Sequence, residues 1–109
     1  MFHLGLMYRR TSKFHEALYY FTRVQEKLEK DKTVYIQRGL VYQDMGNNWK
    51  AIEDFDQAIK LEDTYSPAHF YLGISKLHDH KPEEAKAHFE RALSLDVNRE
   101  NPGIYDGLA

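Results

Sequence analysis

Four glycines recur along the 109-residue chain at a constant step of 34 residues, and this step restricts the fold more than any other feature of the sequence. Other small and aromatic residues follow the same step in the same register. The ladders are Gly5, Gly39, Gly73 and Gly107; Ala17, Ala51 and Ala85; Phe21, Phe55 and Phe89; and Val24, Ala58 and Ala92. Such coincident ladders indicate an internal repeat, in which one supersecondary unit is copied and stacked.

Each period contains two helical patterns joined by a short turn. In the middle period, "TVYIQRGLVYQDMG" predicts a first helix and "NWKAIEDFDQAIKLE" predicts a second. The second pattern places Ala51, Phe55 and Ala58 on one face, and Gly46 with the asparagine pair after it predicts the turn. A glycine inside a helix costs about 1 kcal/mol relative to alanine. Its presence in every first helix therefore predicts a close approach to the alanines of the second helix.

The helix–turn–helix period of 34 residues resembles the tetratricopeptide repeat (TPR) family. "YIQRGLVY" and "HFYLGISK" are similar to the family's first helix, and "AIEDFDQAIKL" and "AKAHFERALSL" to its second. The resemblance covers essentially the whole chain. It implies an all-α, TPR-type helical-hairpin solenoid with a right-handed superhelical twist. The repeats would span residues 1–31, 32–65 and 66–99, with a partial fourth at 100–109.

The chain departs from the family pattern at several positions. Arg38 replaces the usual leucine, His69 the usual aromatic residue and His80 the usual turn glycine. The proline that usually follows the second helix is absent from all three periods. The first period ends in "VQEKLEKDK", which has lost the apolar pattern of the later periods. We therefore expect this helix end to be more exposed than the others.

The ends of the array have no polar capping helix of the kind that natural arrays usually carry. Residues 1 and 109 both fall inside first-helix patterns. We therefore expect one array over residues 1–109 that is a segment of a longer protein, or whose ends are covered by another chain. End-to-end self-association is one form that such covering could take.

In the TPR family, first helices line a concave groove that holds a partner peptide or helix. Two apolar ladders and one flanking ladder occupy the corresponding positions here. The candidate groove residues are Phe2, His3, Leu6, Ile36, Gln37, Leu40, Phe70, Tyr71, Ile74, Leu77, His78, Ile104, Tyr105 and Leu108. This apolar, aromatic-rimmed groove would suit an apolar or amphipathic peptide segment. Alternatively, a tightly wound array buries these residues between successive first helices, and no ligand is implied.

The groove chemistry argues against one known class of TPR partner. Modules that grip the acidic tail of cytosolic chaperones carry Lys, Asn and Arg at these positions, because a carboxylate needs charged or polar donors. The matching residues here are Phe2, Leu6, Gln37, Phe70 and Ile74. Only the glutamine can donate a hydrogen bond, so we do not expect a carboxylate clamp.

Charge and composition exclude several other classes. A net charge of −2 gives no electrostatic case for nucleic acid or an anionic membrane. A small basic cluster, Arg9, Arg10 and Lys13, is interpreted as a solvated helix end. No apolar run approaches the roughly 18 residues of a membrane span. The chain has no cysteine, which excludes disulfides and thiolate sites and favours an intracellular, cytoplasmic location.

No catalytic, cofactor or metal site is predicted. Nucleotide-binding loops, nucleophile elbows and zinc-protease motifs are absent. Four of the six histidines lie in the third period, but their spacing forces no three-ligand geometry. The sequence thus favours a non-catalytic protein–protein interaction module. An architectural segment of a larger helical-repeat assembly and a regulatory arm of a multidomain enzyme stay open.

Trp49 stands beside the usual aromatic site at the start of the second helix of the middle repeat. We expect it to pack over the turn. If it were exposed, it would offer a second contact point for a partner.

Overall fold

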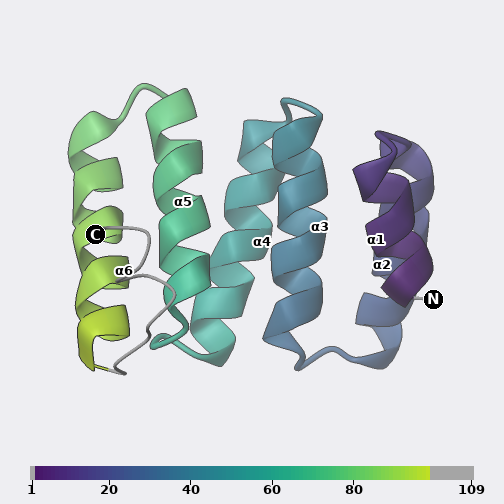
Figure 1. Cartoon of the computed structure of the whole chain (residues 1–109), viewed down its shortest axis with the longest axis horizontal. Helices are drawn as coiled ribbons and strands as arrows, with labels where there is room; N and C mark the ends of the chain where they lie inside the picture. Colours follow the sequence, from purple (N-terminus) through teal and green to yellow (C-terminus); the bar gives the residue numbers. More distant parts are fainter. Residues whose placement is uncertain (1, 99–109) are drawn as a thin grey trace.

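The computed structural model describes residues 2–98, with side chains through residue 95. All regular structure in this part of the chain is helical. The helices are α1 (Phe2–Arg10), α2 (Phe14–Lys27), α3 (Lys32–Asp44), α4 (Asn48–Leu61), α5 (Ser66–His78) and α6 (Pro82–Asn98). They form three consecutive pairs along the long axis, with α1 and α2 at one end and α6 at the other (Figure 1). The predicted all-α helical-repeat fold is confirmed.

Each first helix approaches its partner closely at the repeated glycine. A Cβ atom built on Gly39 would lie 2.6 Å from Cε1 of Phe55, well inside the van der Waals distance. The equivalent glycines of α1 and α5 face the equivalent phenylalanines at 2.6 and 2.7 Å. The close approach predicted from the glycine ladder is confirmed, but its partner is the phenylalanine ring and not an alanine. The phenylalanine ring fills the space in front of the glycine, so a side chain at the glycine position would collide with it.

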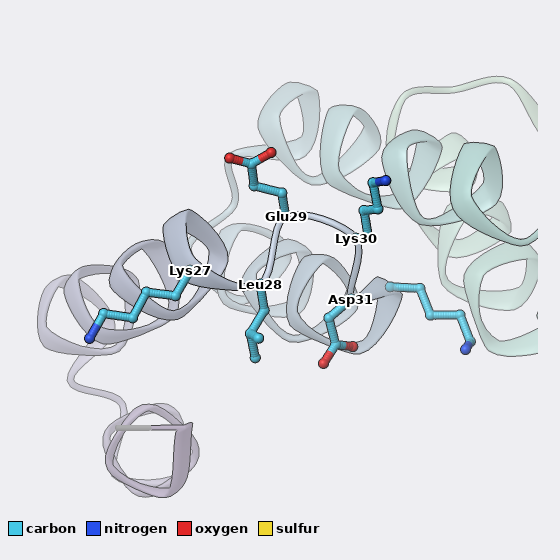
Figure 2. Close-up of a pocket in the computed structure, with 6 residues that line it drawn as sticks. Lys27, Leu28, Glu29, Lys30 and Asp31 are labelled. Carbon is cyan, nitrogen blue, oxygen red and sulfur yellow. The ribbon is translucent and has the colours of Figure 1, made fainter.

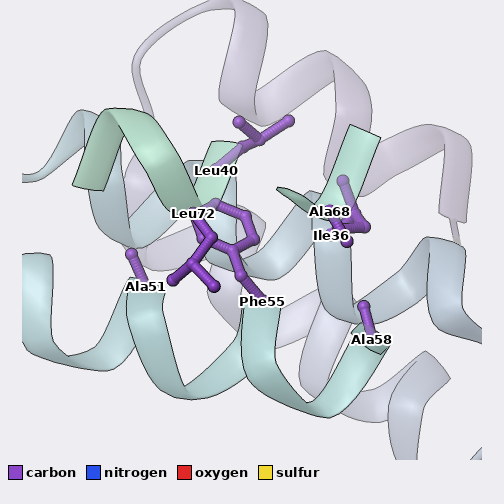
Figure 3. Close-up of a cluster of buried hydrophobic side chains, with 7 residues drawn as sticks. All are labelled: Ile36, Leu40, Ala51, Phe55, Ala58, Ala68 and Leu72. Carbon is purple, nitrogen blue, oxygen red and sulfur yellow. The ribbon is translucent and has the colours of Figure 1, made fainter. Parts of the chain in front are cut away.

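The hydrophobic core continues from one pair to the next. Its central cluster joins α3 and α4 to α5 (Figure 3). The members are Ile36, Leu40, Ala51, Phe55, Ala58, Ala68 and Leu72. A second cluster of Ala17, Phe21 and Val41 joins α2 to α3. Fully burying one such Phe, Leu or Val side chain contributes about 1.5–3 kcal/mol, so stacking supplies much of the stability of each pair.

The turn inside each pair contains one residue in the left-handed backbone region. These residues are Ser12, Gly46 and His80, with φ of 63°, 82° and 58°. They are spaced by the repeat length, so the same turn occurs three times. His80 adopts this conformation although glycine is the residue that does so without steric cost. For a side-chain-bearing residue the cost is roughly 1–2 kcal/mol.

The connection from α2 to α3 is exposed, as the sequence predicts. α2 ends at Lys27, and Leu28 directly after it is 49% exposed. Asp31 then caps α3, because its carboxylate accepts a hydrogen bond from the Thr33 N–H at 2.9 Å.

We call the contact of the second helix pair (α3 and α4) with the first pair the first seam, and the contact of the third pair (α5 and α6) with the second pair the second seam. At the first seam, Arg38 of α3 donates from Nε and Nη2 to the two oxygens of Asp54 on α4 of the same pair, at 2.9 and 2.8 Å. Its Nη1 donates to Gln25 Oε1 at 3.3 Å and to Thr22 Oγ1 at 3.5 Å. One side chain of α3 therefore connects α4 with α2.

The electrostatics of this pair fit a buried ion pair. The hydrogen bond to Asp54 raises the pKa of the Arg38 guanidinium, which keeps it charged. Burial raises the pKa of the Asp54 carboxyl, and the hydrogen bonds and charge of Arg38 oppose that shift. The two-pronged geometry is that of a charge-assisted contact.

The second seam uses neutral hydrogen bonds. Ser75 is fully buried; its hydroxyl accepts from Gln43 Nε2 at 2.9 Å, and its carbonyl accepts from Asn48 Nδ2 at 2.8 Å. Leu72, which occupies the repeat position of Arg38, is 2% exposed and packs into the central cluster.

Candidate functional site

The groove residues predicted on α3 are mostly core residues. Ile36 and Leu40 are 3% and 5% exposed and pack against α4 and α5 (Figure 3). They offer almost no surface to a ligand, because the neighbouring first helix lies over them. Gln37 is half-buried, and its side-chain oxygen is buried without a hydrogen-bond partner. The middle repeat thus matches the alternative in which the array buries these positions itself.

The groove residues predicted on α5 are far more accessible. Phe70 and Leu77 are each 46% exposed, and their spacing puts them on one face of the helix. Tyr71 and Ile74 are half-buried beside them, and His78 is exposed. The Phe70 ring lies 5.4 Å from that of Tyr71, centroid to centroid. Together these side chains form an apolar, aromatic surface on α5.

At the other end of the array, α1 presents a mixed surface. Phe2 and Leu6 are half-buried and His3 is exposed. Leu6 lines a hollow of about 310 Å³ together with Arg9, Arg10 and Asp44.

The basic cluster at the end of α1 is only partly a solvated helix end. Arg9 Nε donates to Asp44 Oδ2 at 2.9 Å, which joins α1 to α3. Sequence reasoning missed this pair, because the acid lies one repeat later in the chain. Arg10, which lines the same hollow, is exposed.

Three further groove candidates, Ile104, Tyr105 and Leu108, lie outside the described residues. The accessible predicted residues therefore form two groups, one on α1 and one on α5. Buried residues of α3 lie between these two groups.

A larger hollow of about 610 Å³ lies at the connection between α2 and α3 and involves none of the predicted residues. Lys27, Leu28, Glu29, Lys30, Asp31 and Lys32 line it. Figure 2 shows that the charged ends of these side chains point in different directions. No set of polar groups converges there on one point, so this hollow lacks the arrangement of polar groups that would bind a specific ligand.

The histidines of the third repeat pack against each other. The rings of His69 and His88 stack with centroids 5.9 Å apart, and His69 Nε2 donates to the Asp63 carbonyl at 2.8 Å. Burial lowers the pKa of His88, and the nearby His69 and Lys76 add to the effect. Among the described residues, no three His, Asp or Glu side chains are grouped to hold a metal ion.

The expectation for Trp49 is wrong. This side chain is 66% exposed, and Lys50 Nζ lies 5.7 Å from its ring centroid. Ala51, two positions along α4, is fully buried. Residues two apart in a helix point in nearly opposite directions, so burying the alanine ladder turns the tryptophan outward.

Residues 33–65 match the family model described as tetratricopeptide repeat. The middle segment of the chain is therefore a tetratricopeptide repeat. Such repeats generally mediate protein–protein interactions. Tetratricopeptide repeat protein 6 of Homo sapiens is 33% identical over 63 residues, which are 58% of this chain and 12% of that protein. Anaphase-promoting complex subunit 3 of Schizosaccharomyces pombe is 28% identical over 101 residues, covering 79% of this chain and 15% of that protein. The chain thus spans a small fraction of the length of both relatives.

Solved structures agree on the fold. The first TPR of Spaghetti (RPAP3) bound to the HSP90 peptide SRMEEVD has a TM-score of 0.82 and 26% identity, and the match covers 95% of this chain and 86% of that one. A MamA structure has a TM-score of 0.81 and 27% identity, covering 88% of this chain and 55% of that one. None of the helices in the described part of the chain is long and apolar enough to cross a membrane.

Proposed function

We propose that this TPR array is a non-catalytic interaction module that binds an apolar or amphipathic segment of a partner protein along its first helices. The observation that carries the proposal is the exposure of Phe70 and Leu77, 46% each, on one face of α5. Large apolar side chains that stay exposed side by side usually mark a contact surface. Aromatic anchors are also the residues that contribute most at protein interfaces.

The accessible members of the predicted groove would share the binding. Apolar anchoring falls to Phe2 and Leu6 on α1 and to Phe70, Ile74 and Leu77 on α5. Hydrogen bonds would come from the polar members at the groove, which are His3, Gln37, Tyr71 and His78. Ile36 and Leu40 support the groove from within the core and do not touch the ligand.

An acidic segment is the competing ligand class. Two of the similar structures, the first and second TPR of Spaghetti, hold the HSP90 peptide SRMEEVD. In this chain the clamp positions are mainly apolar, but Arg10 lies beside Leu6 at the α1 end of the same surface. The test must therefore distinguish an apolar anchor from a carboxylate.

The experiment is a selection of binding peptides from a random display library, followed by fluorescence anisotropy with the selected peptides and with SRMEEVD. We expect peptides with apolar residues spaced for one helix face. Phe70→Asp/Leu77→Asp should weaken their binding about tenfold or more, which corresponds to about 1.4 kcal/mol. Leu61→Asp is the matched control, because Leu61 is a leucine of similar exposure, 39%, on the second helix α4.

Equal affinity for the Phe70→Asp/Leu77→Asp variant and the native chain would refute the proposed surface. Recovery of acidic peptides alone, with binding lost in Arg10→Glu and kept in the α5 variant, would establish the carboxylate alternative. An architectural segment and a regulatory arm of an enzyme are the two other functions that the sequence leaves open. Failure of any peptide to bind would favour them.

A further inference from the structure

The third repeat contains a buried histidine whose ring has one nitrogen without a partner. His69 of α5 is only 8% exposed. Its Nε2 donates to the carbonyl oxygen of Asp63, 2.8 Å away in the connection between α4 and α5. Its Nδ1 is buried and has no hydrogen-bond partner. Because a carbonyl oxygen can only accept, the hydrogen bond places the single proton of the neutral ring on Nε2.

The ring of His69 stacks on a second histidine, His88 of α6. The two ring centroids lie 5.9 Å apart, with an angle of 27° between the ring planes. Charged groups of three helices act on His88, namely Lys76 of α5, Asp56 of α4 and Glu84 of α6. The histidine pair therefore lies at the second seam, where the third repeat meets α4.

The closed seam accommodates an added proton poorly. On His69 the proton would go to Nδ1, which would bury a charged N–H without an acceptor. Burial lowers the pKa of His88, and the nearby His69 and Lys76 lower it further. Protonation of both rings would place two cations face to face, and like charges this close repel each other.

The neighbouring acids offset this cost only in part. Glu84 is already paired with Lys76, at 3.4 Å. Asp56 acts on His88 from α4, but burial raises the pKa of the Asp56 carboxyl, and the nearby Lys76, His88 and Lys60 only oppose that shift. This carboxylate therefore loses its charge at a higher pH than an ordinary aspartate, and it becomes a weaker counter-ion as the pH falls.

The equivalent positions of the middle repeat hold no imidazole. Tyr35 stands at the position of His69, and Asp54 stands at the position of His88. The Asp54 carboxylate accepts two hydrogen bonds from Arg38. The stacked histidines are therefore a feature of the second seam that the first seam does not share.

We propose that the stacked pair His69–His88 is a pH-sensitive switch, which keeps the second seam closed at neutral pH and favours its opening in acid. Opening exposes the rings to water, where an imidazole binds a proton near pH 6.5. The open form thus binds more protons than the closed form below that pH, so the seam is fully stable above it and loses stability as the pH falls.

Hydrogen exchange of the native chain, measured by mass spectrometry at pH 7.5 and at pH 5.5, tests the switch. The protection of α5 and α6 is compared with that of α2 and α3 in the same sample, which cancels the general effect of pH on exchange. We expect the relative protection of α5 and α6 to fall about threefold at pH 5.5. The measurement involves no ligand, so its result is independent of the proposed function.

Two variants each remove one imidazole. His88→Gln replaces a half-buried ring, and His69→Tyr introduces the residue that the middle repeat has at this position. Each should abolish the relative loss of protection at pH 5.5. His15→Gln is the control, because this histidine of α2 is exposed, and it should keep the native response. Circular dichroism at pH 7.5 checks the fold, and His88→Gln alone decides the test if His69→Tyr does not fold.

Three results would overturn the proposal. The first is a native chain whose relative protection is the same at both pH values. The second is an equal loss in all helices, which would assign the pH effect to global unfolding. The third is a relative loss that persists in His88→Gln, because other groups would then be responsible for it.

Discussion

The two seams of the array join equivalent helices but place their polar contacts at different positions. In the first seam the charged pair Arg38–Asp54 lies where the third repeat has Leu72 and His88, and Val41 supplies an apolar contact. In the second seam Leu72 is the apolar member. The polar member there is Ser75, at the position of Val41.

This difference between the two seams shows which positions of the repeat determine the fold and which positions can vary. All three described helix pairs keep the glycine–phenylalanine approach, since that contact sets the distance within a pair. The positions that face the next repeat accept an ion pair, a hydroxyl or an aliphatic side chain. The polar groups buried at these two positions, the guanidinium of Arg38 and the hydroxyl of Ser75, each have a hydrogen-bond partner, because an unpaired one costs about 1–3 kcal/mol.

Removing the acid of the first seam should have the largest effect. Asp54→Ala leaves the guanidinium of Arg38 partly buried without its counter-ion, and we expect a loss of about 3–5 kcal/mol in the free energy of unfolding. Urea denaturation followed by circular dichroism measures it. The double variant Arg38→Leu/Asp54→Leu should recover most of the loss, because it imitates the leucine of the second seam. A loss below about 1 kcal/mol in Asp54→Ala would mean that the pair behaves as a surface salt bridge.

Replacing the repeated glycine by alanine should cost more stability in the middle repeat than in the third repeat. Gly39→Ala drives a methyl group into the Phe55 ring, which is fully buried, and should cost about 1–3 kcal/mol. Gly73→Ala faces the half-buried Phe89. That ring can shift, so the helix-propensity gain of about 1 kcal/mol roughly cancels the cost.

A double-mutant cycle checks the cause of this difference. In a Phe55→Leu background the cost of Gly39→Ala should largely disappear, because the ring has been removed. An unchanged cost in that background would place the strain in the backbone instead of the ring.

The hydroxyl of the second seam should contribute less than the ion pair of the first. Ser75→Ala removes the acceptor of Gln43 and should lower the free energy of unfolding by about 1 kcal/mol. Ser94→Ala, at an exposed position of α6, is the control. Differential scanning calorimetry compares the two, and equal melting temperatures would show that the buried hydrogen bond adds nothing.

The smallest expected effect is a pH dependence of the third repeat. The pKa of His88 is lowered by burial, then by His69 and Lys76, while Asp56 and Glu84 act in the opposite direction. The unfolded chain therefore binds more protons than the folded one below about pH 6.5. Stability is retained above that pH and lost as the pH falls, by less than about 1 kcal/mol because the site is partly solvated.

Unfolding of the native chain and of His88→Gln at pH 7.5 and at pH 5.5 measures this dependence. The substitution should flatten the slope. An identical slope in both proteins would assign the pH dependence to other groups.

The sequence predicted the features that depend on one repeat alone. The 34-residue ladders identified the helix pairs, the turns and the close approach at glycine, because each follows from local spacing and side-chain size. Burial of Ile36 and Leu40 depends on how closely α5 lies over α3, which no spacing reveals. Trp49 was misjudged because its neighbour on the ladder, Ala51, determines which side of α4 faces inward.

The sequence contains a signal for the ion pair between Arg38 and Asp54 that comparison with the family pattern does not reveal. Arg38 stands out as a departure from the family pattern, but its partner did not. Across the three repeats, the position of Asp54 holds a tyrosine, an aspartate and a histidine, so the acid occurs only in the repeat that has the arginine. Comparing repeats position by position, instead of each with the family, would have paired the two residues.

Arg38 also has a consequence for the order in which the array opens. Its side chain contacts groups on α2 and α4 from its place on α3. Removing α4 would strand the cation, and removing α2 would leave Nη1 of Arg38 without its acceptors, so the first two repeats should lose their amide protection against hydrogen exchange in a single step. The third repeat meets this unit mainly through apolar contacts and the hydrogen bonds of Ser75, so we expect it to detach and rejoin as a separate foldon.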